Sequence, residues 1–366
     1  MNPIFFMPTK VICEKDAIKT QGHLIKNLGD TALIVTGRHS SRANGSLENL
    51  TTVLKTNNIK YFIFDEVEEN PSTETINKIK KLHIDNGINV VIGVGGGSPM
   101  DASKAASVLL ANTGMDAKDL FTTDEFKSLP VVAIPTTAGT GSETTQYSIL
   151  TDHEIENKLA IKTKLFPTLA YLDASFLMNT PKEITVNTAI DALSHLIEGY
   201  LSTQGNIFSN ALAESGLKLF KECIPFLEDE TIIFEVREKL LAASSIAGMV
   251  IAQSGTSLPH GMGYPLTYHH NAPHGMANGL LLKEYLKSYA NHESERIENI
   301  LKLLEFSNID EFGTFIKRLS TITLNISQNE LKAYAEYMIS NEAKLKNHPF
   351  KITFEELLSI YEKSLI

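Results

Sequence analysis

The feature that most constrains the fold is a change of pattern near residue 180. Before it, short β-branched runs alternate with amphipathic helical segments; after it, helical periods dominate. Alternating strands and helices predict right-handed βαβ units and a parallel sheet. We therefore predict an α/β domain with a parallel sheet over residues 1–180 and an all-helical domain over residues 181–366, with the boundary at Thr180-Pro181.

The predicted strands of the first domain cover residues 31–36, 61–64, 90–94 and 131–134, and the helices between them cover 47–56, 73–86 and 99–111. The third strand has no polar side chain, which is typical of a strand buried on both faces. Ligands of such sheets bind beyond the carboxyl ends of the strands. The loops after these strands are thus the expected cofactor site.

The loop after the third strand reads GGGSPMD from Gly95. Three glycines let the backbone approach a bulky anion, and we expect Ser98 to cap a helix that starts at Pro99, with Asp101 completing the cap. A helix start of this kind binds phosphate. The alternative is a tight turn that needs glycine only for geometry. The spacing is not the usual dinucleotide fingerprint, because position 98 is serine.

The loop after the fourth strand reads PTTAGTGSETT from residue 135. Its hydroxyl groups and open main-chain amides could contact the ribose, the pyrophosphate or the nicotinamide carboxamide of a dinucleotide. The alternative is a polar surface loop, but long loops beside a core strand are usually functional or disordered.

The loop after the first strand bears on the choice of cofactor. It begins with Gly37, Arg38 and, two residues further on, Ser40, where NAD-specific folds place an acid for the ribose hydroxyl. With donors and no acid, this loop favours NADP(H). The alternative is that Arg38 and Arg42 are merely solvated.

A histidine-rich stretch and one predicted helix indicate a metal site in the second domain. The stretch 257–278 holds His260, His269, His270 and His274, and Asp191 and His195 lie at i and i+4 in the helix 188–200. A carboxylate with imidazoles suits iron or zinc. The alternatives are an ordinary helix surface pair and a solvated loop. The helix is otherwise apolar, and the glycines and prolines of the stretch predict a bent backbone that presents side chains.

Composition excludes several classes of protein. The net charge of −10 over 366 residues argues against a nucleic-acid or anionic-membrane partner. The two cysteines are far apart, which fits free thiols in a reducing compartment, and neither a signal peptide nor a membrane span is evident. We therefore expect a cytoplasmic protein.

Taken together, these motifs resemble the iron-containing (group III) alcohol dehydrogenases over nearly the whole chain. The match includes TGRHSS, ENPS, GGGSPMD, PTTAGTGSE, PHGMGYPL and PHGMANGLLL. The resemblance implies a dehydroquinate-synthase-like fold, a homodimer, and a metal held by Asp191, His195, His260 and His274. It also implies that glycine at position 37 goes with NADP(H) and aspartate with NAD(H). The cofactor residues that the resemblance implies are Gly37, Ser40, Asn70, Pro71, Gly96, Gly97, Ser98, Asp101, Thr136, Thr137, Thr140, Thr145, Lys158 and Leu177. To these the loop after the first strand adds Arg38.

One position departs from the family pattern. Many relatives have a further histidine four residues after the third ligand, where this chain has Tyr264. A neutral phenol donates a hydrogen bond but is a weak base near neutrality, since its ordinary pKa is about 10. His269 or His270 are the alternatives for proton transfer, although an ordinary loop role is the simpler interpretation of both.

We therefore predict hydride transfer between NADP(H), or NAD(H), and a short aliphatic alcohol, diol or aldehyde, assisted by Fe²⁺ or Zn²⁺ as a Lewis acid. There are two alternatives: a glycerol-dehydrogenase-like polyol oxidoreductase and, from another enzyme class, a dehydroquinate-synthase-like lyase. The lyase needs several basic residues around the metal, and the stretch 257–278 has none. A non-enzymatic metal-binding module leaves the glycine and threonine loops without a purpose.

Overall fold

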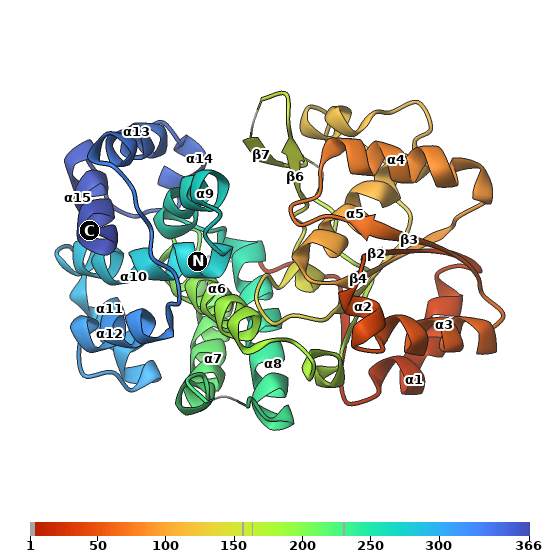
Figure 1. Cartoon of the computed structure of the whole chain (residues 1–366), viewed down its shortest axis with the longest axis horizontal. Helices are drawn as coiled ribbons and strands as arrows, with labels where there is room; N and C mark the ends of the chain where they lie inside the picture. Colours follow the sequence, from red (N-terminus) through yellow and green to blue (C-terminus); the bar gives the residue numbers. More distant parts are fainter. Residues whose placement is uncertain (1–3, 156, 163, 230) are drawn as a thin grey trace. The chain divides into compact units, whose positions relative to one another are not determined.

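The computed structural model describes residues 4–155, 157–162, 164–229 and 231–366. The chain forms two compact units (Figure 1). One consists of residues 7–180, and the other of Pro181–Ile366 together with residues 4–6. The first is an α/β unit and the second is helical.

The α/β unit is built on a parallel sheet. Its strands are β1 (Lys10–Cys13), β2 (Thr31–Gly37), β3 (Lys60–Val67), β4 (Val90–Gly95), β5 (Val131–Pro135) and β8 (Leu169–Leu172). They lie in the order β1-β8-β5-β4-β2-β3, and every pairing is parallel. The predicted parallel sheet is confirmed. The edge strand β1 and its neighbour β8 were not predicted, nor was the antiparallel pair β6 (Ile149–Asp152) and β7 (Asn157–Ala160).

The helices of this unit are α1 (Ala17–Gln21), α2 (Ser40–Ala43), α3 (Ser46–Thr56), α4 (Thr73–His83) and α5 (Gly97–Ala111). Helix α5 packs against the middle of the sheet, at β4, β2 and β5. Its buried face is rich in alanine, including Ala102, Ala105 and Ala106, which are 0% exposed. Small side chains let the helix axis lie close to the sheet, and Val91 and Leu33 fill the space beneath it.

Strand register brings the loops of this unit together. Thr36 pairs with Val94, and Gly95 pairs with Pro135, so β2, β4 and β5 end at the same edge. All residues of β4 are buried, as predicted for a strand covered on both faces. The loops after Gly37, Gly95 and Pro135 therefore leave the sheet side by side.

The second unit contains no strand among its described residues. Its helices are α6 (Lys182–Leu201), α7 (Ile207–Cys223), α8 (Phe234–Ser254), α9 (Leu258–His270), α10 (His274–Ala290), α11 (Ser294–Leu304), α12 (Ile309–Leu319), α13 (Gln328–Ile339), α14 (Glu342–Leu345) and α15 (Phe354–Leu365). The all-helical prediction is confirmed. Helix α6 contacts α7, α8, α9 and α10, so it is the central helix of this unit.

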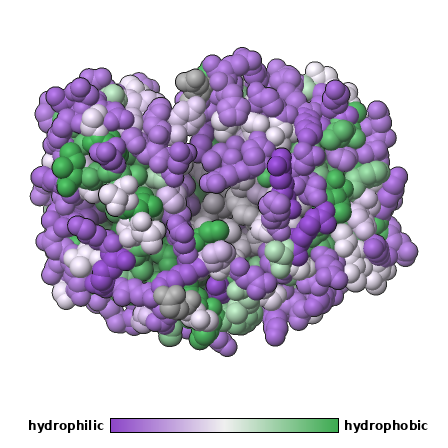
Figure 2. All heavy atoms as spheres, in the orientation of Figure 1, coloured by the Kyte–Doolittle hydropathy of each residue, from purple (hydrophilic) through white to green (hydrophobic). Residues whose placement is uncertain are grey.

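The surface is mostly polar. The face drawn in Figure 2 is covered mainly by hydrophilic residues, with small separate hydrophobic areas. Within the described residues no single helix is long and apolar enough to cross a membrane, and one sharply bent pair, Phe234–Ser254 with Leu258–His270, meets the length and composition criteria.

Candidate functional site

Helix α6 buries three acidic or imidazole side chains along one face. Asp191, His195 and Glu198 are spaced at i, i+4 and i+7, and they are 3%, 5% and 0% exposed. The helix is buried on almost every side because its other residues in this region are apolar. Polar groups placed on such a helix need partners from neighbouring helices.

Helices α9 and α10 supply those partners. His260 lies in the first turn of α9, and His274 is the first residue of α10. One ligand atom each from Asp191, His195 and His260 lies within 4.8 Å of the others, a grouping that can hold a metal ion. The Nε2 atom of His274 is 3.8 Å from Oδ1 of Asp191, and its side chain is 34% exposed. The three histidines predicted as ligands thus all lie close to the fourth predicted ligand, Asp191.

The stretch around these histidines is helical, so the prediction of a bent loop is wrong. Gly261, Gly263 and Pro265 lie inside α9, and only residues 271–273 separate it from α10. The glycines serve close packing instead: a Cβ atom at Gly263 would lie 2.1 Å from Oδ1 of Asn278, and one at Gly261 would lie 2.6 Å from the sulfur of Met338. Packing against neighbouring helices therefore outweighs the preference of these glycines and of the proline for a turn.

Gly275 fixes the approach of α10 to α6. A Cβ atom there would lie 2.0 Å from the main-chain oxygen of Asn187 and 2.9 Å from Cβ of Asp191. The Asn187 side chain also accepts a 2.8 Å hydrogen bond from the amide of Met276. Because α10 lies this close to α6, the His274 side chain can reach Asp191.

The electrostatics of the cluster favour positive charge between its carboxylates. Burial acts to raise the pKa of Asp191, but His195, His274 and His260 together hold it well below its usual range. Burial acts to lower the pKa of His260, but the carboxylates of Glu198 and Asp191 outweigh it and raise that pKa. The site therefore stabilises a cation at its centre.

The donor atoms fit a metal ion. The Nε2 atom of His260 is buried and has no hydrogen-bond partner, and it lies 3.4 Å from Oδ1 of Asp191. A buried nitrogen without a hydrogen bond is unfavourable unless another group occupies its lone pair. Imidazole and carboxylate donors are those that iron and zinc accept.

Sequence reasoning missed two residues of this site. Glu198 contacts the ring of His260, and the amide nitrogen of Asn278 lies 3.2 Å from Oδ1 of Asp191 and 3.3 Å from Nε2 of His274. Spacing could have revealed both. Glu198 continues the face of Asp191 and His195, and Asn278 lies one turn after His274.

The proton-transfer candidates occupy different surroundings. The ring of Tyr264 stacks on that of His274, with centroids 5.8 Å apart. In contrast, His269 stacks on Tyr334 of α13, and Nε2 of His270 is 2.9 Å from the Tyr334 hydroxyl. Of the three, Tyr264 is the residue placed against a predicted ligand.

In the α/β unit, the glycine and threonine loops pack against each other. A Cβ atom at Gly97 would lie 2.8 Å from Cγ2 of Thr140, and one at Gly96 would lie 3.2 Å from Oγ1 of Thr137. Helix α5 starts at Gly97 with Gly96 as its N-cap, so the prediction that Ser98 caps it is wrong. The glycines allow the helix to begin earlier.

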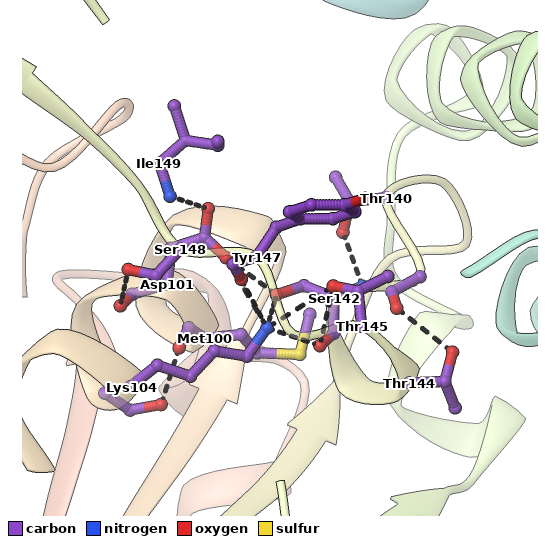
Figure 3. A network of polar contacts seen from close by, with 12 residues as sticks. Met100, Asp101, Lys104, Thr140, Ser142, Thr144, Thr145, Tyr147, Ser148 and Ile149 are labelled. Carbon is purple, nitrogen blue, oxygen red and sulfur yellow. Dashed lines mark hydrogen bonds and ion pairs between the residues drawn. The ribbon is translucent and has the colours of Figure 1, made fainter. Parts of the chain in front are cut away.

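Asp101 does not complete a helix cap either, because it binds the threonine loop. Its Oδ1 accepts a 2.7 Å hydrogen bond from the Ser142 hydroxyl, and its Oδ2 accepts one of 3.0 Å from the amide of Ile149. One turn further on, Nζ of Lys104 donates to the oxygens of Ser142 and Tyr147 (Figure 3). Burial lowers the pKa of Lys104 to about 8, although Asp101 acts to raise it. Two charged residues of α5 thus hold the loop.

Three predicted cofactor residues form a second group. The amide of Asn70 donates to Oγ of Ser98 at 3.0 Å, and Nζ of Lys158 donates to Oδ1 of Asn70 at 2.9 Å. Asn70 has a φ of 58°, a left-handed conformation that asparagine tolerates. This group joins the loop after β3 to the start of α5.

The remaining predicted residues lie at the ends of strands. Gly37 ends β2, Ser40 starts α2, and Arg42 pairs at 2.6 Å with Asp65 of β3, so Arg42 is not merely solvated. The others, Arg38, Pro71, Thr136, Thr137, Thr145 and Leu177, follow β2, β3, β5 and β8 at the same edge of the sheet.

Comparison with known proteins decides the family. The sequence pattern of the iron-containing alcohol dehydrogenase family matches residues 8–174 of this chain. The sequence pattern of the C-terminal region of the same family matches residues 185–365. The chain belongs to the iron-containing alcohol dehydrogenases. The resemblance predicted from its motifs is confirmed, and the comparisons favour this reading over the polyol and lyase alternatives.

Similar members of this family include both solved structures and curated relatives. The iron-containing alcohol dehydrogenase of Thermotoga maritima is 40% identical, with a TM-score of 0.93 over 100% of this chain and 99% of that one. The NADPH-dependent butanol dehydrogenase of Clostridium saccharobutylicum is 29% identical over 86% of this chain and 83% of its own length. The bifunctional aldehyde-alcohol dehydrogenase of Escherichia coli is 32% identical over 84% of this chain, which spans only 35% of that longer protein.

Proposed function

We propose that this protein is a metal-dependent alcohol dehydrogenase or aldehyde reductase, which transfers a hydride between NADP(H) and a short aliphatic alcohol, diol or aldehyde. The observation that carries the proposal is the buried cluster of Asp191, His195 and His260, in which one imidazole nitrogen lacks a hydrogen-bond partner. Family membership and the butanol dehydrogenase relative support the substrate class.

In this proposal Asp191, His195, His260 and His274 hold the metal. When bound, the metal supplies Lewis-acid chemistry that favours the alcohol oxygen as an alkoxide. Ligation by nitrogen and oxygen without thiolate favours Fe²⁺, although the affinity order lets Zn²⁺ compete. Asp191 lowers the net charge of the centre, and the burial of Asp191, His195 and His260 shields these ligands from water.

The loops of the α/β unit hold the nucleotide in this proposal, and the nicotinamide is the hydride donor or acceptor. Gly96, Gly97 and the start of α5 offer amides to the pyrophosphate. NADP(H) is the proposed form because Gly37 leaves room for a 2′-phosphate and Arg38 is close to it in sequence.

Tyr264 is the proposed proton donor, because its ring stacks on that of His274.

A cytoplasmic location and a homodimer, both expected from the sequence, also stay predictions.

The test is absorbance of the nicotinamide band. Apo protein is loaded with Fe²⁺ without oxygen, butyraldehyde is added, and oxidation of NADPH is compared with that of NADH, beside a Zn²⁺-loaded sample. Faster oxidation of NADPH is expected. Faster oxidation of NADH would overturn the cofactor preference alone. No oxidation with either metal, over a panel of short aldehydes, would overturn the proposed activity.

A further inference from the structure

Glu198 is a completely buried carboxylate in the middle of the helical unit. It is 0% exposed and lies on α6, two turns after Asp191. An ionised carboxylate in such a place is costly unless hydrogen-bond donors surround it. Among the residues that the structure describes, its hydrogen-bond donors come from the start of α9.

One oxygen of Glu198 serves as the cap of α9. Its Oε2 accepts a 2.7 Å hydrogen bond from the amide of Ser257, the N-cap residue, and lies 3.4 Å from the amide of His260. The Ser257 side chain makes no capping hydrogen bond of its own. A negative charge at this end also opposes the helix dipole. The carboxylate of α6 thus fixes where α9 begins.

The other oxygen of Glu198 holds the ring of His260. Its Oε1 contacts Nδ1 of His260 directly. Because a carboxylate only accepts hydrogen bonds, the hydrogen must be on Nδ1. The neutral ring then carries its lone pair on Nε2, which is the buried nitrogen that faces Asp191 without a hydrogen bond.

We propose that Glu198 is a positioning residue of the metal centre: it fixes both the orientation and the tautomer of His260, so that Nε2 is the ligand atom. This inference rests on the proposed metal site. Carboxylates that orient metal-bound histidines typically change metal affinity by 10–100-fold when they are replaced, which is roughly the effect expected here.

Glu198→Gln separates this role from that of a simple helix cap. The amide oxygen of glutamine still accepts from Ser257 and His260, so the cap is kept. Its NH₂ group then faces Nδ1 of His260, which must become an acceptor, and the hydrogen moves to Nε2. The variant should fold but present the wrong nitrogen to the metal.

The experiment measures metal binding rather than turnover. Co²⁺ is titrated into the apo form of the full chain, and its visible absorption and competition with a chelator give ligation and affinity. Ser194→Ala is the matched control, because Ser194 is a buried polar residue of the same helix whose hydroxyl donates a hydrogen bond to the Ile190 oxygen, within the helix itself. Wild type and Ser194→Ala should bind alike, and Glu198→Gln should bind 10–100-fold more weakly.

Each outcome is decisive. Equal Co²⁺ affinity and equal spectra for wild type and Glu198→Gln, with binding lost in His260→Ala, would overturn the inference and leave the metal site standing. Absence of Co²⁺ binding by wild type would overturn the proposed function and the inference with it. If Glu198→Gln does not fold, nitrogen NMR of histidine-labelled, Zn²⁺-loaded wild type decides: hydrogen on Nδ1 and metal on Nε2 of His260 supports the inference, and the reverse overturns it.

Discussion

The ammonium nitrogen of Lys104 lies 2.7 Å from the main-chain oxygen of Ser142, and the Lys104 side chain is 0% exposed. The same nitrogen lies 2.6 Å from the oxygen of Tyr147 and 4.0 Å from Oδ1 of Asp101. A charged donor buried at the base of a loop holds that loop in one conformation, because several loop oxygens converge on it in a place that is closed to water.

Lys104→Met should release the loop after β5. The substitution removes the hydrogen bonds from a buried charged donor to the oxygens of Ser142 and Tyr147, so we expect a loss of about 2–4 kcal/mol in the free energy of unfolding. Nucleotide affinity should fall as well. Urea unfolding and fluorescence titration with NADPH measure both. Lys118→Met is the control, since Lys118 forms an exposed pair with Glu154 and its removal should cost far less stability. Equal effects of the two substitutions would contradict this.

Gly37→Asp should shift preference from NADP(H) to NAD(H). A Cβ atom at Gly37 meets only the Val67 oxygen, at 3.4 Å, so the side chain fits. Its charge repels a 2′-phosphate, and we expect NADPH binding to weaken by about tenfold or more, which equals roughly 1.4 kcal/mol. Dissociation constants for both nucleotides provide the measurement. Gly37→Asn has nearly the same shape without the charge, and an identical shift in that variant would refute the electrostatic reason.

Gly275→Ala should damage the metal centre without removing any ligand. The added methyl group would lie 2.0 Å from the Asn187 oxygen, so α10 must move away from α6. Overpacking of this kind costs about 1–3 kcal/mol. Thermal unfolding of the apo form and Co²⁺ affinity should both decrease. In Gly114→Ala, where no atom lies within 4 Å of the added carbon, neither should change.

His274→Ala should remove most of the bound metal while the protein stays folded, because this side chain is 34% exposed and lies at the end of a helix. His269→Ala is the control from the same histidine-rich segment, since its ring contacts Tyr334 instead. Metal content after dialysis compares the two. If His274→Ala retained wild-type metal content and turnover, His274 would not be a ligand.

Acid should destabilise the helical unit through His348. Burial, followed by the charge of His292, lowers the pKa of His348 to about 4, and its Nδ1 lacks a hydrogen-bond partner. Above pH 6.5 the ring is neutral whether the chain is folded or unfolded. As the pH falls from 6.5 to about 4, only the unfolded chain binds the proton, so stability falls, by roughly 3 kcal/mol in total.

The measurement for His348 is urea unfolding of the apo protein between pH 7 and pH 4. His348→Phe keeps an aromatic ring beside Tyr285, Tyr289 and Phe350 but cannot take up a proton. Its stability should fall less steeply than that of the wild type over this range. Parallel curves would show that His348 does not titrate as the structure indicates.

Local pattern was enough to predict the central strands and most helices. An uninterrupted apolar run such as that of β4 is typical of a buried strand, and the 3.6-residue period of residues 309–319 indicates the helix that the structure has as α12 (Ile309–Leu319). The sequence also indicated which side chains could bind a metal. Asp191 and His195 lie one turn apart in a largely apolar helix, and such buried polar groups need polar partners. Strands β1 and β8 were missed, since four residues carry too little periodicity.

The sequence by itself determined the central strands, the loops that follow them and the placement of Asp191 and His195 one turn apart on a helix, because each depends on residues close together in the chain. Only the tertiary structure decided that Gly261 and Gly263 lie in a helix, that Asp101 binds the threonine loop, and that Glu198 holds His260. These outcomes depend on contacts between residues far apart in sequence. There, packing against a neighbouring element outweighs the small free-energy preferences of a turn or a cap.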